Sequence, residues 1–202
     1  MSMKQEEKNL SLLARLHRFS ATVECSVVTD KDGAIHDLEV GIAAFCELLS
    51  RARSDRASVF VIGNGGSAAI ASHVVIDFVN VAKLRAVTLH EPSMLTCFTN
   101  DFGYEYSFSR ALERLALPND VLVAISSSGS SRNILNAAIQ MAEIGGKVIT
   151  LSGFAPDNPL RTKGLLNFWL DVSDYGLVEV GHQFILHNIA DRFAAELGHS
   201  RS

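Results

Sequence analysis

Short apolar segments that alternate with helix-length segments are the feature of this sequence that most restricts its fold. The apolar runs lie at 59–62, 86–89, 121–125, 148–151 and 168–170, and each is bounded by turn or helix signals. Strands that are apolar on both faces are typical of parallel sheets with helices on both sides. The pattern therefore predicts an α/β fold, a three-layer sandwich around a central parallel sheet.

Two helices are predicted before this alternating part. Apolar residues recur at helical spacing over 8–25 and 36–53, and a turn-forming sequence at 30–33, DKDG, separates the two stretches. A last helix is predicted over 176–197. With 202 residues, 48% of them hydrophobic, the chain can bury one sizeable core. We expect a single domain over 1–202, with a helical extension at 1–55 and an α/β core at 56–198.

Charge and cysteine usage exclude several function classes. The chain has 18 basic and 22 acidic residues, a net charge of −4, and no basic patch that would favour nucleic acid or a membrane surface as a partner. The polar N-terminus and the absence of a long apolar run lead us to expect a cytoplasmic protein. Cys25, Cys46 and Cys97 are widely spaced, without a CxxC pair, and are predicted to be buried reduced thiols.

A glycine-rich turn follows the first apolar run. We call residues 63–67, GNGGS, the glycine turn. Ligands of open parallel sheets bind beyond the carboxyl ends of the strands, and glycines allow close approach of the backbone. Ser67 is expected to cap the next helix, whose N–H groups can bind an anion or a sugar hydroxyl. The turn matches neither a P-loop nor a dinucleotide-binding motif. A purely structural tight turn is the alternative.

A serine-rich turn follows the third apolar run and opens another helix. Residues 126–131, SSSGSS, are called the serine turn below. Hydroxyl groups and backbone N–H groups at a helix N-terminus can bind a phosphate without any cationic side chain. A flexible loop is the alternative for this segment alone. Because both turns follow strands of one predicted parallel sheet, we expect them to lie at the same edge.

Ionisable side chains gather on two of the predicted helices. His73 and Asp77 lie one turn apart, and Glu179, His182 and His187 lie in the last helix. Such groups bind divalent metals or act as acid and base, whereas each histidine taken alone is more often packed in a core or an interface. Glu179 and His187 are eight residues apart, about 12 Å along a continuous helix. Both can ligate one ion only if Glu179 precedes the regular helix or if they belong to different subunits.

From about residue 59 to residue 197 the chain resembles the sugar isomerase (SIS) domain, and specifically the phosphoheptose isomerase family. The motifs that carry the resemblance are GNGGS at 63–67 with His73 downstream, TNDFGY at 99–104 with FSR at 108–110, ISSSGSS at 125–131, VITLSG at 148–153, and His182 with His187. The resemblance implies a flavodoxin-like SIS domain preceded by two helices. It also implies an isomerase of sedoheptulose 7-phosphate and a heptose 7-phosphate, working as a homotetramer with active sites at subunit contacts.

The resemblance further implies roles for individual residues. Asp77 and His187 would be the catalytic acid/base pair, acting through an enediol. A divalent metal, commonly zinc in the family, would be bound by His73, Asp77, Glu179 and His187. The serines of the serine turn would hold the phosphate. The implied substrate-binding residues are Asn64, Gly65, Gly66, Ser67, Asn100, Asp101, Ser126, Ser127, Ser128, Ser131 and Glu179.

Three features depart from the family pattern. Asp77 stands where the family usually has Glu, and Glu179 stands where it usually has Gln. The stretch 79–85 is shorter than the family's usual basic loop and lacks its Arg. An isomerase of a related long-chain sugar phosphate, for example an octose phosphate, is therefore an alternative. A non-catalytic SIS module that binds protein partners, like one that associates with the bacterial replication initiator, and a sugar-phosphate-sensing regulator are others. The presence of both Asp77 and His187 favours an enzyme.

Overall fold

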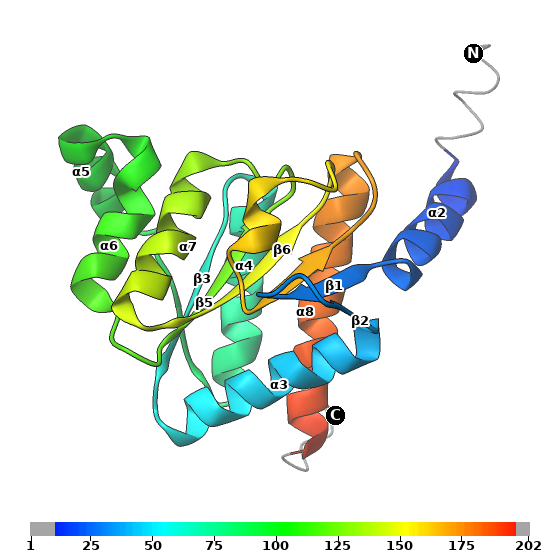
Figure 1. The fold of residues 1–202 in the computed structure, drawn as a ribbon, viewed down its shortest axis with the longest axis horizontal. Coiled ribbons are helices and arrows are strands. Elements are labelled where there is room, and N and C mark those ends of the chain that lie inside the picture. Colours follow the sequence, from blue (N-terminus) through cyan, green and yellow to red (C-terminus); the bar gives the residue numbers. More distant parts are fainter. Residues whose placement is uncertain (1–10, 197–202) are drawn as a thin grey trace.

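Strands and helices alternate along most of the chain in the computed structural model, which describes residues 11–196 (Figure 1). The elements are α2 (Leu12–Glu24), β1 (Val27–Asp30), β2 (Ile35–His36), α3 (Leu38–Ser54), β3 (Ser58–Ile62), α4 (Gly66–Asn80), β4 (Arg85–Thr88), α5 (Pro92–Phe102), the 3₁₀ helix η1 (Tyr104–Tyr106), α6 (Ser107–Leu115), β5 (Val121–Ser126), α7 (Arg132–Ile144), β6 (Lys147–Ser152), the 3₁₀ helix η2 (Pro159–Thr162), β7 (Leu166–Trp169) and α8 (Tyr175–Glu196).

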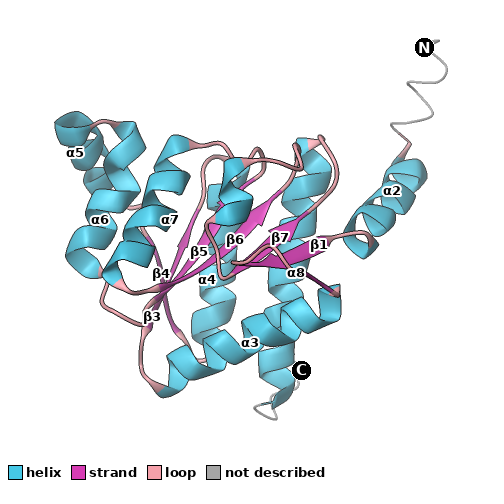
Figure 2. Cartoon of the chain, viewed as in Figure 1, coloured by secondary structure: helices cyan, strands magenta, loops and turns pink. Residues whose placement is uncertain are grey.

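The strands form one seven-stranded sheet in the order β2-β1-β7-β6-β5-β3-β4 (Figure 2). Strands β3 to β7 are parallel to one another, whereas β1 is antiparallel to both β7 and β2. From β3 the chain moves outward to β4, and it then returns to the other side of β3 to form β5. This reversal of direction leaves the loops after β3 and β5 on either side of a crevice, where open α/β sheets bind their ligands.

Helices cover both faces of the sheet, because alternate strand residues point to opposite sides. Val59 and Val61 of β3 belong to a buried cluster with residues of α3, α4 and α8. Phe60 and Ile62 of the same strand belong to a second cluster with residues of α6 and α7. The predicted three-layer α/β sandwich is confirmed, and the two predicted N-terminal helices correspond to α2 and α3.

The predicted helical extension at 1–55 differs from the structure in one respect, since it contains the strands β1 and β2. The DKDG sequence between them is a hairpin turn, in which the Asp30 carboxylate accepts hydrogen bonds from the backbone N–H groups of Asp32 and Ala34. Val28 of β1 is fully buried beside α3. The sheet therefore extends into the N-terminal segment. Residues 8–10 and 197 of the predicted helices lie outside the described residues.

The cysteines are free, but their burial differs from the prediction. Cys46 is buried, and this burial raises the pKa of its thiol to about 11. Cys25, which ends α2, and Cys97 of α5 are exposed, so the prediction of buried thiols is wrong for these two. Leu95, two residues before Cys97, packs against the core, whereas Cys97 itself is exposed. No helix within residues 11–196 has the length and apolar character needed to cross a membrane.

His182 is fully buried in α8 and packs against the end of β6. Its Nε2 atom lies 3.1 Å from the carbonyl oxygen of Ser152, to which it donates, and its Nδ1 atom has no hydrogen-bond partner. Burial lowers the pKa of this imidazole to about 4. His182 is therefore a neutral core residue.

This burial makes stability depend on pH. An unfolded histidine has a pKa near 6.5, so between about pH 6.5 and pH 4 the unfolded chain binds a proton that the folded chain does not. We expect the His182 contribution to the free energy of unfolding to fall by about 3 kcal/mol as the pH falls through this window. Denaturant unfolding of wild type and His182→Gln at several pH values measures the difference. The same pH slope in both proteins would contradict the prediction, and His17→Gln, at an exposed position, is the control.

Candidate active site

The glycine turn joins β3 to α4, and close packing explains its glycines. Gly65 has a φ of +54°, and a Cβ on Gly63 would lie 2.6 Å from the carbonyl oxygen of Ser67. Ser67 lies within the first turn of α4 and no side chain caps that helix, so the predicted Ser67 cap is wrong. The carboxyl group of Glu179, from α8, lies beside Gly66 instead, 2.4 Å from where a Cβ would be. A carboxylate is stabilised at this position by the N-terminus of α4.

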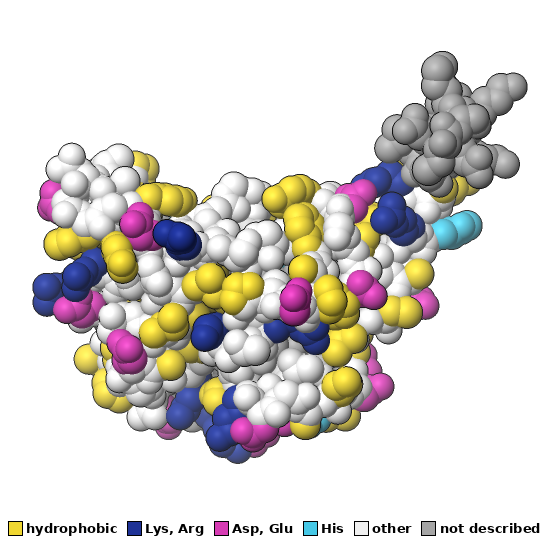
Figure 3. All heavy atoms as spheres, turned by 45° about the horizontal axis from the view of Figure 1, so that its top comes forward, with side chains coloured by type: hydrophobic (Ala, Val, Ile, Leu, Met, Phe, Trp, Pro, Cys, Tyr) yellow, Lys and Arg dark blue, Asp and Glu magenta, His cyan; other side chains and the backbone are white. Residues whose placement is uncertain are grey.

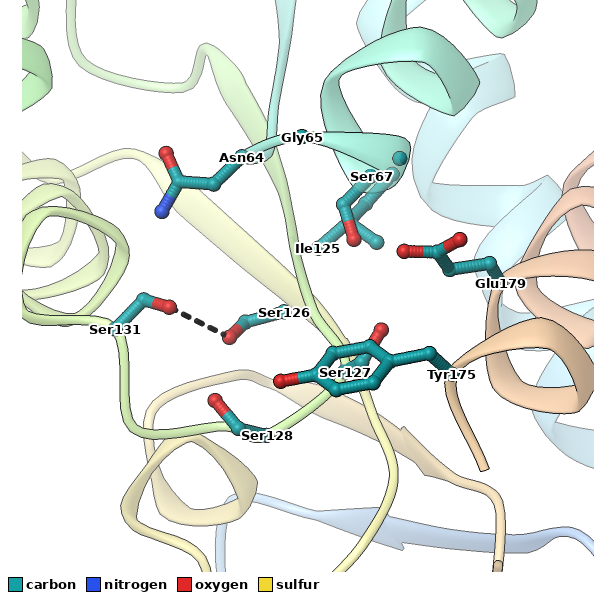
Figure 4. Close-up of a pocket in the computed structure, with 11 residues that line it drawn as sticks. Asn64, Gly65, Ser67, Ile125, Ser126, Ser127, Ser128, Ser131, Tyr175 and Glu179 are labelled. Atoms are coloured by element: carbon teal, nitrogen blue, oxygen red, sulfur yellow. Dashed lines mark hydrogen bonds between the residues drawn. The ribbon is translucent and has the colours of Figure 1, made fainter. Parts of the chain in front are cut away.

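The serine turn joins β5 to α7 and presents several hydroxyl groups. Gly129, with a φ of +63°, donates its N–H to the carbonyl oxygen of Ser126, which closes the turn. The hydroxyl of Ser126 lies 3.3 Å from that of Ser131 (Figure 4). The buried hydroxyl of Ser127 has no hydrogen-bond partner, and no side chain caps α7 from Ser131. Unused donors at a helix N-terminus are suited to an oxyanion.

A pair of asparagine side chains links the two turns. Asn64 of the glycine turn donates its Nδ2 to the Oδ1 of Asn133 in α7 at 2.9 Å, and Asn133 donates back to the Oδ1 of Asn64 at 2.9 Å. The Tyr104 hydroxyl also donates to the Oδ1 of Asn64, at 2.7 Å. Asn133 is buried. These bonds fix the two turns relative to each other, as a preformed site requires.

A cavity of about 230 Å³ lies between the two turns and the start of α8 (Figure 4). Its walls contain no Lys or Arg, and the middle of this edge of the molecule shows few charged side chains (Figure 3). Hydroxyl and backbone N–H donors would therefore have to bind an anion there. The lining residues are Asn64, Gly65, Gly66, Ser67, Ile125, Ser126, Ser127, Ser128, Ser131, Tyr175 and Glu179.

His73, Asp77 and His187 form a cluster between α4 and α8. The Oδ2 atom of Asp77 lies 2.9 Å from His187 Nδ1 and 3.4 Å from His73 Nε2. One potential ligand atom from each residue lies within 4.8 Å of those of the other two. The side chain of Asp77 is 13% exposed, while His73 is 56% exposed, so the cluster opens to solvent on one side. Two imidazoles and one carboxylate with an open side could hold a divalent metal ion.

Most of the residues predicted to bind substrate line the cavity, and Asn100 and Asp101 do not. These two lie in the last turn of α5, where the Nδ2 of Asn100 donates to the Oδ1 of Asp101 at 3.0 Å. Glu179 lines the cavity but is not part of the His/Asp cluster. Since α8 begins at Tyr175, Glu179 lies within the regular helix. Within one chain, Glu179 and His187 therefore do not reach the same ion.

Sequence reasoning missed three residues of this region. Tyr175 lines the cavity, and Asn133 and Tyr104 hold Asn64. Asn133 lies two residues after the serine turn, at the start of a predicted helix, and this position is its only sequence signal. Tyr104 was part of a quoted motif, but its contact with Asn64 spans forty residues of sequence.

Comparisons with known proteins agree with this fold. The model of the SIS domain family matches residues 29–153. A phosphoheptose isomerase of Geotalea daltonii is 38% identical over 167 residues, which cover 77% of this chain and 83% of that protein. The structures of phosphoheptose isomerases from Neisseria gonorrhoeae and Francisella tularensis are similar in fold. Their TM-scores are both 0.79, with 24% and 22% identity, covering 95% and 96% of this chain and 99% and 100% of theirs.

The family match begins inside β1, which agrees with a sheet that includes the N-terminal strands. The motifs on which the resemblance rested contribute the two turns of the cavity and His73 and His187 of the cluster. The chain therefore belongs to the phosphoheptose isomerase family of SIS-domain proteins.

Proposed function

We propose that this protein is an aldose–ketose isomerase that interconverts sedoheptulose 7-phosphate and an aldoheptose 7-phosphate. The observation that carries the proposal is the combination of a cavity with no Lys or Arg in its walls and a His/Asp cluster, in a chain whose relatives are phosphoheptose isomerases. The reaction moves a proton between adjacent carbons and therefore needs a base, a proton donor and stabilisation of an enediolate oxygen.

The serine turn would hold the phosphate. Ser126, Ser127, Ser128 and Ser131 line the cavity next to the N-terminus of α7, and the Ser127 hydroxyl has no partner in the structure. Binding of the phosphate would position the carbon chain, because binding energy from a remote group can orient the reacting carbons. Asn64, held by Asn133 and Tyr104, would contact the sugar from the opposite wall.

Asp77 and His187 would exchange the protons. In this role the Asp77 carboxylate removes the carbon-bound proton and His187 donates and removes the hydroxyl proton. The contact of 2.9 Å between Asp77 Oδ2 and His187 Nδ1 orients the imidazole. A divalent metal held by His73, Asp77 and His187, zinc as the resemblance implies, would supply positive charge for the enediolate oxygens.

A homotetramer with shared active sites would bring the Glu179 carboxylate of a neighbouring copy to the His/Asp cluster. Glu179 and His187 are separated by about 12 Å along α8, so a Glu179 ligand would have to come from a neighbouring copy. Apolar side chains on the outer faces of α4 and α8 support such contacts between copies, since large exposed apolar groups that gather together mark interfaces. These side chains are Ile76, Val79, Val180 and Phe184, each between 48% and 66% exposed.

Purified protein is expected to isomerise sedoheptulose 7-phosphate, to lose this activity on treatment with a chelator, and to regain it with Zn²⁺. Free sedoheptulose is the matched control substrate, and its kcat/KM should be at least about 100-fold lower because the phosphate no longer contributes binding energy. A panel of ketose phosphates with five to eight carbons tests the length preference. No turnover of any member by metal-loaded protein would contradict the proposed function.

A further inference from the structure

Tyr175, the first residue of α8, lies over the cavity and has no role in the site described so far. Its side chain lines the cavity from the α8 side, although the residue is 61% exposed. Figure 4 shows the phenol oxygen directed towards the side of the cavity where Ser126, Ser128 and Ser131 present their hydroxyls. Within residues 11–196 this phenol makes no hydrogen bond. A donor is therefore available at the outer wall.

Phe154 holds this ring in place. The two ring centroids are 4.7 Å apart and the planes meet at 74°, the edge-to-face arrangement that aromatic pairs favour. The backbone N–H of Phe154 donates to the carbonyl oxygen of Val172 at 3.1 Å, which ties the loop after β6 to the segment that leads into α8. The ring of Tyr175 thus packs against a residue whose backbone is tied to the segment before α8.

The backbone of Phe154 is strained. Its φ is +58°, a left-handed conformation that bulky residues with a Cβ avoid. Such strain persists where surrounding contacts impose it, and it is concentrated at functional sites. Here the strained residue is the one that carries the supporting ring.

The lack of positive charge in the cavity suggests a role for the Tyr175 hydroxyl. The walls contain no cationic side chain, and Glu179 brings a carboxylate. The affinity of this cavity for a phosphate therefore depends on the number of neutral hydrogen-bond donors directed at the phosphate. Each charge-assisted hydrogen bond offsets part of the repulsion from Glu179 and part of the cost of desolvating the phosphate. The Tyr175 hydroxyl would add a donor on the side that the serine turn does not cover.

We propose that Tyr175 is a substrate-binding residue whose hydroxyl donates a hydrogen bond to the phosphate of the bound sugar phosphate, and that Phe154 is the residue that positions its ring. This inference rests on the proposed function for the identity of the substrate. The phosphate end of the site is then closed by the serine turn on one side and by the phenol on the other.

The test removes the hydroxyl alone. In Tyr175→Phe the ring and its contact with Phe154 remain, so we expect the KM for sedoheptulose 7-phosphate and the inhibition constant of inorganic phosphate to rise about 10-fold, with kcat changed less than about 2-fold. Phe154→Gly suits the left-handed backbone and removes the supporting ring, and it should raise KM by a smaller factor at unchanged kcat. Tyr106→Phe, at a half-exposed tyrosine outside the cavity, is the matched control.

The outcomes separate this inference from the proposed function. Wild-type turnover with an unchanged KM and phosphate inhibition constant in Tyr175→Phe would overturn the role of Tyr175 and leave the isomerase intact. If wild type turns over no sugar phosphate, calorimetric titration with inorganic phosphate tests the role of Tyr175 by itself. Weaker phosphate binding by Tyr175→Phe than by wild type would then support the phenol as a phosphate donor, and equal or no binding in both would overturn it. Melting temperatures of all variants report any loss of folding.

Discussion

Replacing Asp77 with Asn is expected to reduce kcat for sugar phosphate by a factor of about 10² to 10⁴, the usual contribution of a positioned general base. The amide has the shape of the carboxylate but accepts no proton at neutral pH. The substitution also removes the negative charge of Asp77, whose Oδ2 lies 2.9 Å from His187 Nδ1 and 3.4 Å from His73 Nε2. Steady-state kinetics with sedoheptulose 7-phosphate measures the loss.

Two further measurements make the Asp77 result specific. His187→Ala should lose turnover to a similar extent because it removes the other member of the acid/base pair. Metal content of each variant separates loss of a ligand from loss of a base: a variant that keeps its metal but not its turnover has lost the base. Glu143→Gln, at an exposed carboxylate on α7, should behave as wild type. Near-normal turnover of either Asp77→Asn or His187→Ala would show that the catalytic roles are assigned wrongly.

The core of the fold is predictable from the sequence because its strands are apolar on both faces. The five runs from 59–62 to 168–170 each overlap one of the parallel strands β3 to β7. The strands β1 and β2 were missed because they are four and two residues long and sit between helical patterns. β1 forms by pairing with β7, which is more than a hundred residues away in sequence, and β2 pairs with β1. Local pattern gives no sign of such a partner.

The site is predictable to the extent that topology determines it. Turns after β3 and β5 meet because these strands are adjacent and parallel, and the cavity lies between them. The place of Tyr175 depends on how α8 starts and on the ring of Phe154, neither of which has a sequence signal. The separation of Glu179 from His187, in contrast, is predictable from their spacing in sequence. The structure agrees, because both residues lie within the regular helix α8.

Behind the serine turn, Asn158 packs against a glycine that has no room for a side chain. A Cβ on Gly129 would lie 1.8 Å from the Oδ1 of Asn158. Asn158 is buried, and its Nδ2 lies within hydrogen-bond distance of Ser152 Oγ and of the carbonyl oxygens of Gly153 and Ala155. These bonds prevent Asn158 from moving aside. Any side chain at position 129 must therefore displace the serine turn.

Gly129→Ala is accordingly expected to lower kcat/KM for the sugar phosphate by about 100-fold, because a displacement of about 1 Å in a positioning group costs that much. Stability should fall by roughly 2 to 4 kcal/mol from the clash and the φ of +63° together. Gly145→Ala is the matched control. Gly145 has a φ of +91°, but a Cβ there would lie 3.7 Å from Pro118 Cβ, an ordinary contact, so the variant should lose only about 1 kcal/mol of stability and keep its kinetics.

A double variant, Gly129→Ala with Asn158→Ala, distinguishes the clash from the backbone strain. Removing the Asn158 amide leaves the strain at position 129 and removes the two shortest contacts, at 1.8 and 2.2 Å, while the contact with the Cβ of residue 158, at 2.8 Å, remains. We therefore expect kcat/KM to recover in part relative to Gly129→Ala alone. Asn158→Ala by itself controls for the lost hydrogen bonds to the loop after β6. If Gly129→Ala binds substrate as wild type does, the serine turn tolerates displacement and does not hold the phosphate in a fixed geometry. Recovery in the double variant would instead show that contact with Asn158 sets the position of the turn.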